Sequence, residues 1–163
     1  MRAQAWSMDF AASMVIFSTA LLLMLFAWNY SVQQSHDQTS FNVMENAVIA
    51  ASDSLIRHGG SPEGWNQSNV VTIGLSSSEN VINETKAESL MQMNETDLKR
   101  LLGIGNYEFY LEIRYANGSI ASTPSGLAIQ KGIYPTTAST VIPVERQVLY
   151  MDKMAKLKLI AWS

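Results

Sequence analysis

The sequence contains no cysteine, and neither glycine nor proline occurs before Gly59 and Pro62. The absence of cysteine excludes disulfides, thiolate metal ligands and cysteine nucleophiles. The late appearance of glycine and proline leaves the first third of the chain without a residue that ends a helix. Charge is also scarce there, because Asp9 is the only charged residue between Arg2 and Asp37. These absences make the N-terminal segment the most informative part of the chain.

Positive charge is neither abundant nor clustered. The chain has 11 Lys and Arg against 14 Asp and Glu, with a formal net charge of −3. A nucleic-acid-binding surface needs a basic patch to neutralise phosphates. We therefore expect no nucleic acid among the partners.

Motifs that carry catalytic or cofactor chemistry are also missing. No HxxxH, HExxH or calcium-loop pattern occurs. Gly103-Ile-Gly105 lacks the third glycine and the preceding strand of a nucleotide loop, and Pro124-Ser-Gly126 is a turn without the spacing of a nucleophile elbow. We expect a protein that is not an enzyme and that holds no metal and no cofactor.

A long apolar run follows Asp9. It covers residues 10–28, FAASMVIFSTALLLMLFAW, and as a helix it spans roughly 28 Å, about one hydrocarbon core. It is longer than the apolar core of a cleaved secretory signal and ends without a small-x-small site. Arg2 on the short N-terminal side favours an N-terminus inside the cell and the rest outside. A simple membrane anchor fits this length but leaves Asp9 without a role, although a charge costs about 2.5–3.5 kcal/mol at mid-bilayer and less near the edge.

The helix is predicted to continue well beyond the apolar run, from about residue 7 to residue 57. Apolar residues recur in its outer half at intervals of 3, 4, 3 and 4, which is the spacing of one helix face. That face consists of Phe41, Met44, Val48, Ala51 and Leu55. The following sequence, His58-Gly-Gly-Ser-Pro62, is typical of a helix end.

The rest of the chain predicts an α+β domain. We expect a short strand at Val70–Ile73, two helices capped by Asn83 and Asn94, and an alternating strand at Tyr107–Tyr115. Asn117-Gly118 predicts a two-residue hairpin loop that pairs Tyr115 with Ile120.

The C-terminal segment predicts a second hairpin. Its strands are Thr140–Tyr150 and Ala155–Trp162, joined across residues 151–154, and a further strand is expected within Leu127–Ile133. The expected architecture is a long hydrophobic, then amphipathic, N-terminal helix packed against an antiparallel sheet with short helices.

Five Asn-x-Ser/Thr motifs begin at Asn29, Asn66, Asn83, Asn94 and Asn117. They indicate an exported, glycosylated surface, and the last four are candidate N-glycosylation sites. The alternative is that Asn83 and Asn94 are simply helix caps and that Asn117 is a turn residue.

The order of several short segments resembles archaeal type IV pilin-like proteins with class III signal peptides. The region Gln4-Ala-Trp-Ser-Met-Asp-Phe10 resembles their processing site. Further similar segments are Pro62–Trp65, Thr72–Leu75, Asn83–Lys86, Leu101–Ile104, Val144–Arg146 and Leu157–Trp162. Together they extend over nearly the whole chain.

The resemblance implies a fold and a role. A prepilin peptidase would remove a leader of residues 1–4 by cutting between Gln4 and Ala5, or alternatively between Ala3 and Gln4, so that Asp9 becomes residue five or six. Asp9 would then contact the freed amino group of a neighbouring subunit. Residues 5–30 would lie in the membrane before assembly and in the filament core afterwards, 31–58 would form the outer half of the helix, and 59–163 the head.

The expected function is that of a structural subunit of an archaeal surface filament, as a major or minor pilin or a pseudopilin. The implied partners are other pilin subunits, an assembly platform and a separate ATPase. The alternative is an outward-facing binding or adhesion domain on a permanent membrane anchor, which does not polymerise.

Overall fold

The structure is a computed structural model that describes the backbone of residues 2–163 and all side chains in this range except those of residues 2–7 and 35–37. It contains a long N-terminal helix and a curled mixed sheet of six strands, so the α+β class is confirmed. The chain forms two compact units, one ending at Phe41 and the other covering Asn42–Ser163. The second unit therefore includes the last turns of the long helix.

Helix α1 covers Arg2–Arg57, in agreement with the late appearance of glycine and proline. Its end is closed by a loop that lies far along the sequence. The backbone N–H of Leu75 donates to the carbonyl of Leu55 at 2.8 Å, and that of Asn80 to Ile56 at 3.1 Å. The carbonyl of His58, just beyond the helix, accepts from the backbone N–H of Ser76 at 3.0 Å. These bonds satisfy carbonyls that a helix end leaves without partners.

The segment Val70–Ile73 is not a strand, contrary to the prediction. It makes one isolated bridge, between Ser61 and Thr72, and leads into the loop that closes α1. Gly74 is required at this point because a Cβ there would lie 2.2 Å from the carbonyl oxygen of His58. The β-branched side chains thus occupy an irregular segment whose backbone bonds to Ser61 and Asn66.

The two predicted short helices are confirmed. Helix α2 covers Glu84–Gln92, and the Oδ1 atom of its N-cap Asn83 accepts from the backbone N–H of Lys86 at 3.1 Å. Helix α3 covers Glu95–Leu102, is capped by Asn94, and ends at Gly103 with φ 71°. Both follow the usual chemistry of helix ends.

The sheet has the strand order β1-β2-β5-β6-β3-β4. The strands are β1 Ser76–Ser78, β2 Val81–Ile82, β3 Glu108–Tyr115, β4 Gln130–Gly132, β5 Val141–Tyr150 and β6 Lys153–Trp162. The expected antiparallel sheet is wrong in one respect, because β2 pairs with β5 in parallel through Val81 and Leu149. The strand expected within Leu127–Ile133 is confined to β4, which pairs with β3.

Both hairpin turns differ from the prediction by the length of the loop. Strands β5 and β6 pair as far as Tyr150 and Lys153, so their turn is only Met151-Asp152, with φ 49° and 57°. The Asn117 turn has a three-residue loop instead, because the N–H of Tyr115 donates to the carbonyl of Ser119 and Gly118 has φ 86°. Arg114, rather than Tyr115, consequently pairs with Ile120.

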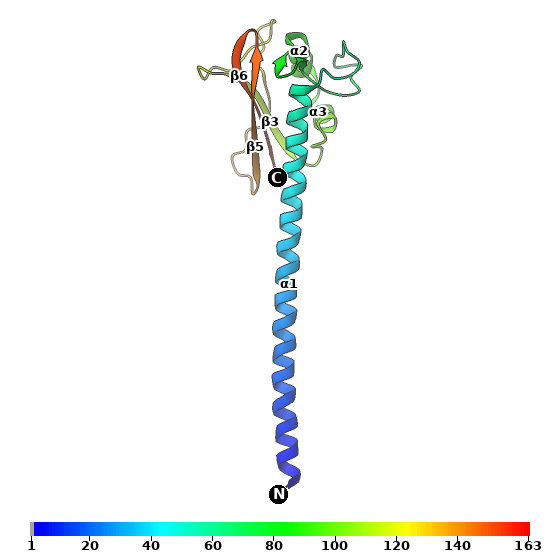
Figure 1. Cartoon of the computed structure of the whole chain (residues 1–163), viewed down its shortest axis with the longest axis vertical. Helices are drawn as coiled ribbons and strands as arrows, with labels where there is room; N and C mark the ends of the chain where they lie inside the picture. The colour runs from blue at the N-terminus through cyan, green and yellow to red at the C-terminus, as the bar shows by residue number, and fades with distance from the viewer. Residues whose placement is uncertain (1) are drawn as a thin grey trace. The chain divides into compact units, whose positions relative to one another are not determined.

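The core of the second unit lies between the sheet and the last turns of α1, with α2 and α3 on the other side of that helix (Figure 1). Met44, Val48, Ala51 and Leu55 are buried in this core. Phe41 belongs to the first unit and is 45% exposed, so the buried stripe begins at Met44 rather than at Phe41. The sheet contributes alternate side chains such as Leu111 and Leu159, which face each other across β3 and β6.

Candidate functional site

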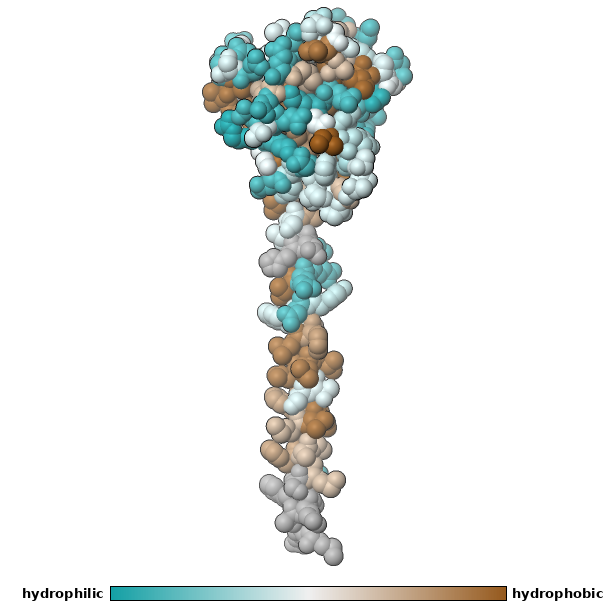
Figure 2. All heavy atoms as spheres, turned by 180° about the vertical axis from the view of Figure 1, so that it is seen from behind, coloured by the Kyte–Doolittle hydropathy of each residue, from teal (hydrophilic) through white to brown (hydrophobic). Residues whose placement is uncertain are grey.

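The first unit presents large apolar side chains without cover from the rest of the described chain. Those exposed between residues 8 and 32 are Met8, Phe10, Met14, Val15, Ile16, Phe17, Leu21, Leu22, Leu23, Met24, Leu25, Phe26, Trp28, Tyr30 and Val32. In Figure 2 brown and tan side chains predominate along much of this unit, whereas the visible face of the second unit is mostly teal and white. A continuous apolar surface of this size marks a membrane or protein interaction site.

Two of the hydroxyl side chains inside the apolar run bond to the backbone of the helix itself. The hydroxyl of Ser13 donates to the backbone carbonyl of Asp9, and that of Thr19 to the carbonyl of Val15, both at 2.8 Å. These hydroxyls therefore do not need water. Among the described residues, α1 from Met8 onward is the one helix long and apolar enough to cross a membrane.

Asp9 lies at the start of this surface with an exposed side chain. Within the part of the chain whose side chains are described, it has no ion-pair partner. The predicted processing residues Ala3, Gln4 and Ala5 are in the backbone of α1, but their side chains lie outside the described residues, as does that of Arg2.

The outer face of the sheet carries a buried carboxylate that sequence reasoning missed. Glu112 and Tyr110 alternate with core residues on β3 and lie on the opposite face of the strand, yet they are only 5% and 6% exposed. Arg114 donates to Glu112 through Nη2 at 2.7 Å and through Nε at 3.3 Å, and the Tyr110 hydroxyl donates at 3.0 Å. The sequence feature that could have indicated this cluster is a tyrosine on the same strand face as several charged residues.

The pKa values of this cluster follow from its geometry. Burial by itself would raise the pKa of the Glu112 carboxyl, but the hydrogen bonds from Arg114 and Tyr110 outweigh burial and lower it. Burial, followed by the bond to Glu112, raises the pKa of Tyr110 to about 12. The cluster is therefore a stabilised ion pair, and neither group is poised to exchange protons near neutral pH.

Two further side chains fasten the sheet to the helices. Lys131 on β4 donates from Nζ to the carbonyls of Met91, at 2.7 Å, and Met93 at the end of α2, and burial lowers its pKa. Arg146 on β5 forms an ion pair with Asp53 of α1, with Nη2 and Oδ1 2.8 Å apart but without the alignment of a hydrogen bond. Both arrangements are structural.

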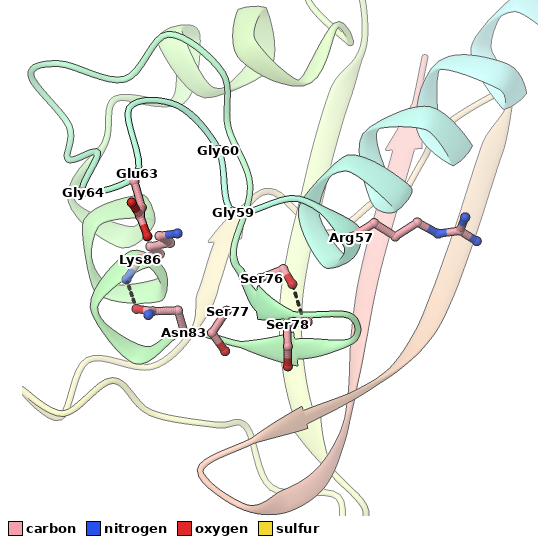
Figure 3. Close-up of a pocket in the computed structure, with 10 residues that line it drawn as sticks. All are labelled: Arg57, Gly59, Gly60, Glu63, Gly64, Ser76, Ser77, Ser78, Asn83 and Lys86. Carbon is pink, nitrogen blue, oxygen red and sulfur yellow. Dashed lines mark hydrogen bonds between the residues drawn. The ribbon is translucent and has the colours of Figure 1, made fainter.

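An open groove of about 630 Å³ lies near the end of α1 (Figure 3). It is lined by Arg57, Gly59, Gly60, Glu63, Gly64, Ser76, Ser77, Ser78, Asn83 and Lys86. In Figure 3 Glu63 and Lys86 lie near each other, whereas the Arg57 side chain extends in the opposite direction. The lining has no aromatic residue and no histidine, and the described residues contain no group of three metal-ligating side chains.

The four candidate glycosylation residues occupy two kinds of site. Asn66 and Asn117 lie in exposed loops, whereas Asn83 and Asn94 cap α2 and α3. The sites that stand out in this chain are therefore an uncovered apolar helix with one acid, and exposed asparagine turns. In comparisons with known proteins, the chain matches no family model, no curated protein and no solved structure.

Proposed function

We propose that this chain is a structural subunit of an archaeal type IV pilus-like surface filament, as a major or minor pilin or a pseudopilin. The observation that carries the proposal is the contrast within α1. The helix exposes apolar side chains on all sides of its first part, and it supplies one buried face to a complete domain core in its last turns. A helix that is apolar all round requires lipid or other helices around it.

Asp9 supplies the polar contact that drives the proposed assembly step. Lipid tails are as apolar as leucine, so moving this helix from the membrane into a bundle of helices yields little hydrophobic free energy. Polar contacts then decide whether and in which register helices associate. A carboxylate about 4 Å from an amino group gains about 4 kcal/mol at an effective dielectric constant of 20, part of which offsets the desolvation of both charges.

Each stage of this assembly involves its own partner. A prepilin peptidase cuts between Gln4 and Ala5, or between Ala3 and Gln4, and frees the amino group that Asp9 of the next subunit contacts. The membrane holds the helix before assembly, with the N-terminus inside and the second unit outside. An assembly platform and a separate ATPase supply the work, since the sequence has no nucleotide-binding motif.

A permanently anchored binding domain is the second candidate, because the same exposed apolar helix is long enough to span a membrane. The two candidates differ in the fate of the helix. Mass spectrometry of filaments sheared from the cell surface separates them. A filament subunit that begins at Ala5 or Gln4 supports the pilin, whereas a chain found only in membranes that still begins at Met1 supports the anchor.

The sharpest test changes Asp9. We expect Asp9→Ala and Asp9→Asn to reduce the amount of chain in sheared filaments by about a hundredfold, the effect of breaking a buried ion pair. The amount in the membrane fraction should not change. Asp9→Glu should restore part of the assembly, and Ser13→Ala, which removes a hydroxyl one turn away, is the matched control. Normal filament incorporation of Asp9→Ala would contradict the proposed role of Asp9.

A further inference from the structure

The Asn-x-Ser/Thr motifs of this chain differ in the donors that the asparagine Oδ1 accepts and in whether a helix follows. In the motif 66–68, Asn66 Oδ1 accepts the backbone N–H of Ser68 at 2.9 Å and its hydroxyl at 2.6 Å. In the motif 117–119, Asn117 Oδ1 accepts the same two donors from Ser119, at 3.0 and 2.7 Å. A backbone N–H can only donate, so the atom facing it is the oxygen and Nδ2 points away.

Each of these two turns is held by further bonds. Asn69 Oδ1 accepts the backbone N–H of Asn66 at 2.7 Å. At the other turn, Arg114 Nη1 donates to the carbonyl of Gly118 at 2.6 Å, and Gly118 has φ 86°. Both asparagines are exposed, and within the described residues neither Nδ2 has a hydrogen-bond partner. The two amide nitrogens are thus presented to solvent by turns that are already formed.

The other motifs lie in helices. Asn83 Oδ1 caps α2 through the N–H of Lys86, and Asn94 Oδ1 caps α3 through the N–H of Thr96. The two residues after each asparagine form the first turn of the helix, so an enzyme that extends the motif would have to unwind that turn and lose the cap. Asn29 lies within α1, in the apolar unit.

We infer that Asn66 and Asn117 are the residues of this chain that accept N-linked glycans, and that Asn29, Asn83 and Asn94 are not glycosylated. The co-substrate is an oligosaccharide linked to a lipid through a diphosphate. Nδ2 forms a bond to the anomeric carbon of the sugar, and the bond from that carbon to the diphosphate oxygen breaks. The lipid diphosphate leaves with the electron pair, and one Nδ2 proton passes to a base of the transferase.

The turn geometry favours this step for an electrostatic reason. The lone pair of an amide nitrogen is delocalised into the carbonyl, and it becomes available as the nitrogen loses its proton and charge accumulates on Oδ1. Donors already directed at Oδ1 stabilise that charge without rearrangement. Ser68 and Ser119 each supply two such donors, whereas each capping asparagine accepts one helix N–H.

The test is to produce the full chain in a host that attaches N-glycans to exported proteins, and to measure occupancy by peptide mass spectrometry. We expect occupancy at Asn66 and Asn117 to exceed that at the other three sites by about fivefold or more, the factor that corresponds to the loss of one helix cap. Ser68→Ala and Ser119→Ala should each lower the intact mass by one glycan. Thr85→Ala and Thr96→Ala destroy the motifs of Asn83 and Asn94 in the same way and should leave the glycan mass unchanged.

This inference rests on the outward orientation in the proposed function, which added protease tests on intact cells. If protease reaches the second unit but Asn66 and Asn117 carry no glycan, or Asn83 or Asn94 carries more, the inference is overturned. A chain that protease cannot reach contradicts both the orientation and the inference. Glycans at the two expected sites on a chain that never enters filaments would support the inference and overturn the proposed function alone.

Discussion

The same type of side chain is exposed in the first unit of the chain and buried in the second. Leu23 and Leu55 both lie in α1, yet Leu23 is 65% exposed in the first unit and Leu55 is fully buried in the second. The difference is the sheet, which covers one face of the last turns of α1. The hydrogen bonds of a helix are made within its own segment, whereas the burial of its side chains needs other segments. Within the described residues, the first unit therefore has no cover of the kind that the sheet gives to the second.

Among the effects on the free energy of unfolding, we expect the largest from truncating a leucine in the second unit, compared with a leucine in the first. Leu55→Ala should lower the free energy of unfolding of the second unit by about 2–5 kcal/mol because it leaves a cavity in a packed core. Leu23→Ala should leave that free energy unchanged. Denaturant unfolding of the full chain in detergent, followed by tryptophan fluorescence, measures both. Equal effects of the two substitutions would remove the distinction between the units.

The acidic side chains of the two units differ in their partners. Asp9 has no ion-pair partner among the described side chains, whereas Glu112 is held by Arg114 and Tyr110 within its own strand. Glu112→Gln should lower the free energy of unfolding by about 1–3 kcal/mol at neutral pH. Because folding lowers the pKa of Glu112, its contribution is present above the ordinary value of 4.5 and is lost as pH falls through the folded pKa. Unfolding curves of the variant should therefore depend less on pH in this acidic range than those of the unaltered chain.

The control for Glu112 is an exposed acid on the neighbouring strand β5. Glu145 pairs with Lys156 at 3.2 Å and with Lys158 at 3.9 Å, but it is nearly half exposed. Exposed pairs of this kind stabilise by about 0–1 kcal/mol, so Glu145→Gln should have the smaller effect. A larger loss for Glu145→Gln than for Glu112→Gln would show that burial does not set the strength of these pairs.

A smaller effect on the free energy of unfolding is expected when an asparagine in each unit is changed to alanine. Asn94→Ala removes the N-cap of α3 and should cost about 1 kcal/mol of unfolding free energy. Asn29→Ala lies in the interior of α1, where alanine is the better helix former, and should cost nothing. Both are measured by denaturant unfolding of chain made in a host without N-glycosylation. A similar loss for both variants would mean that the asparagine cap is not the cause.

Much of the fold could be predicted because it depends on local chemistry. The absence of glycine and proline before Gly59 predicted the long helix. The capping residues Asn83 and Asn94 correctly predicted where α2 and α3 begin. The predicted buried face of α1 is wrong only at Phe41. Apolar periodicity indicates which face of a helix is buried, but not the residue at which burial begins. Loop lengths failed by a residue or two, since Asp152 and Met151 adopt positive φ without the glycine that usually signals it.

The rest depended on contacts between distant segments. The apolar residues of Val70–Ile73 satisfy the pattern of a strand, but this segment leads into the loop that closes the end of α1. The parallel pairing of β2 with β5 joins residues far apart in sequence, and no local signal encodes it. Glu112 reads as a solvent-facing acid until Arg114 and Tyr110 are seen to enclose it. For the candidate sites, the sequence indicated Asp9, the sequons and the two caps, and the structure adds the paired hydrogen bonds that Ser68 and Ser119 donate to Asn66 and Asn117.

The closure of the end of α1 also has a mechanical consequence. The carbonyls of Leu55, Ile56 and His58 accept hydrogen bonds from the segment 75–80, which includes β1, and Asp53 pairs with Arg146 on β5. Tension applied along α1 is shared among these contacts and the core packing of Val48 and Leu55, so no single bond carries the whole load. We therefore expect the last turns of α1 to resist extraction from the domain when the chain is pulled.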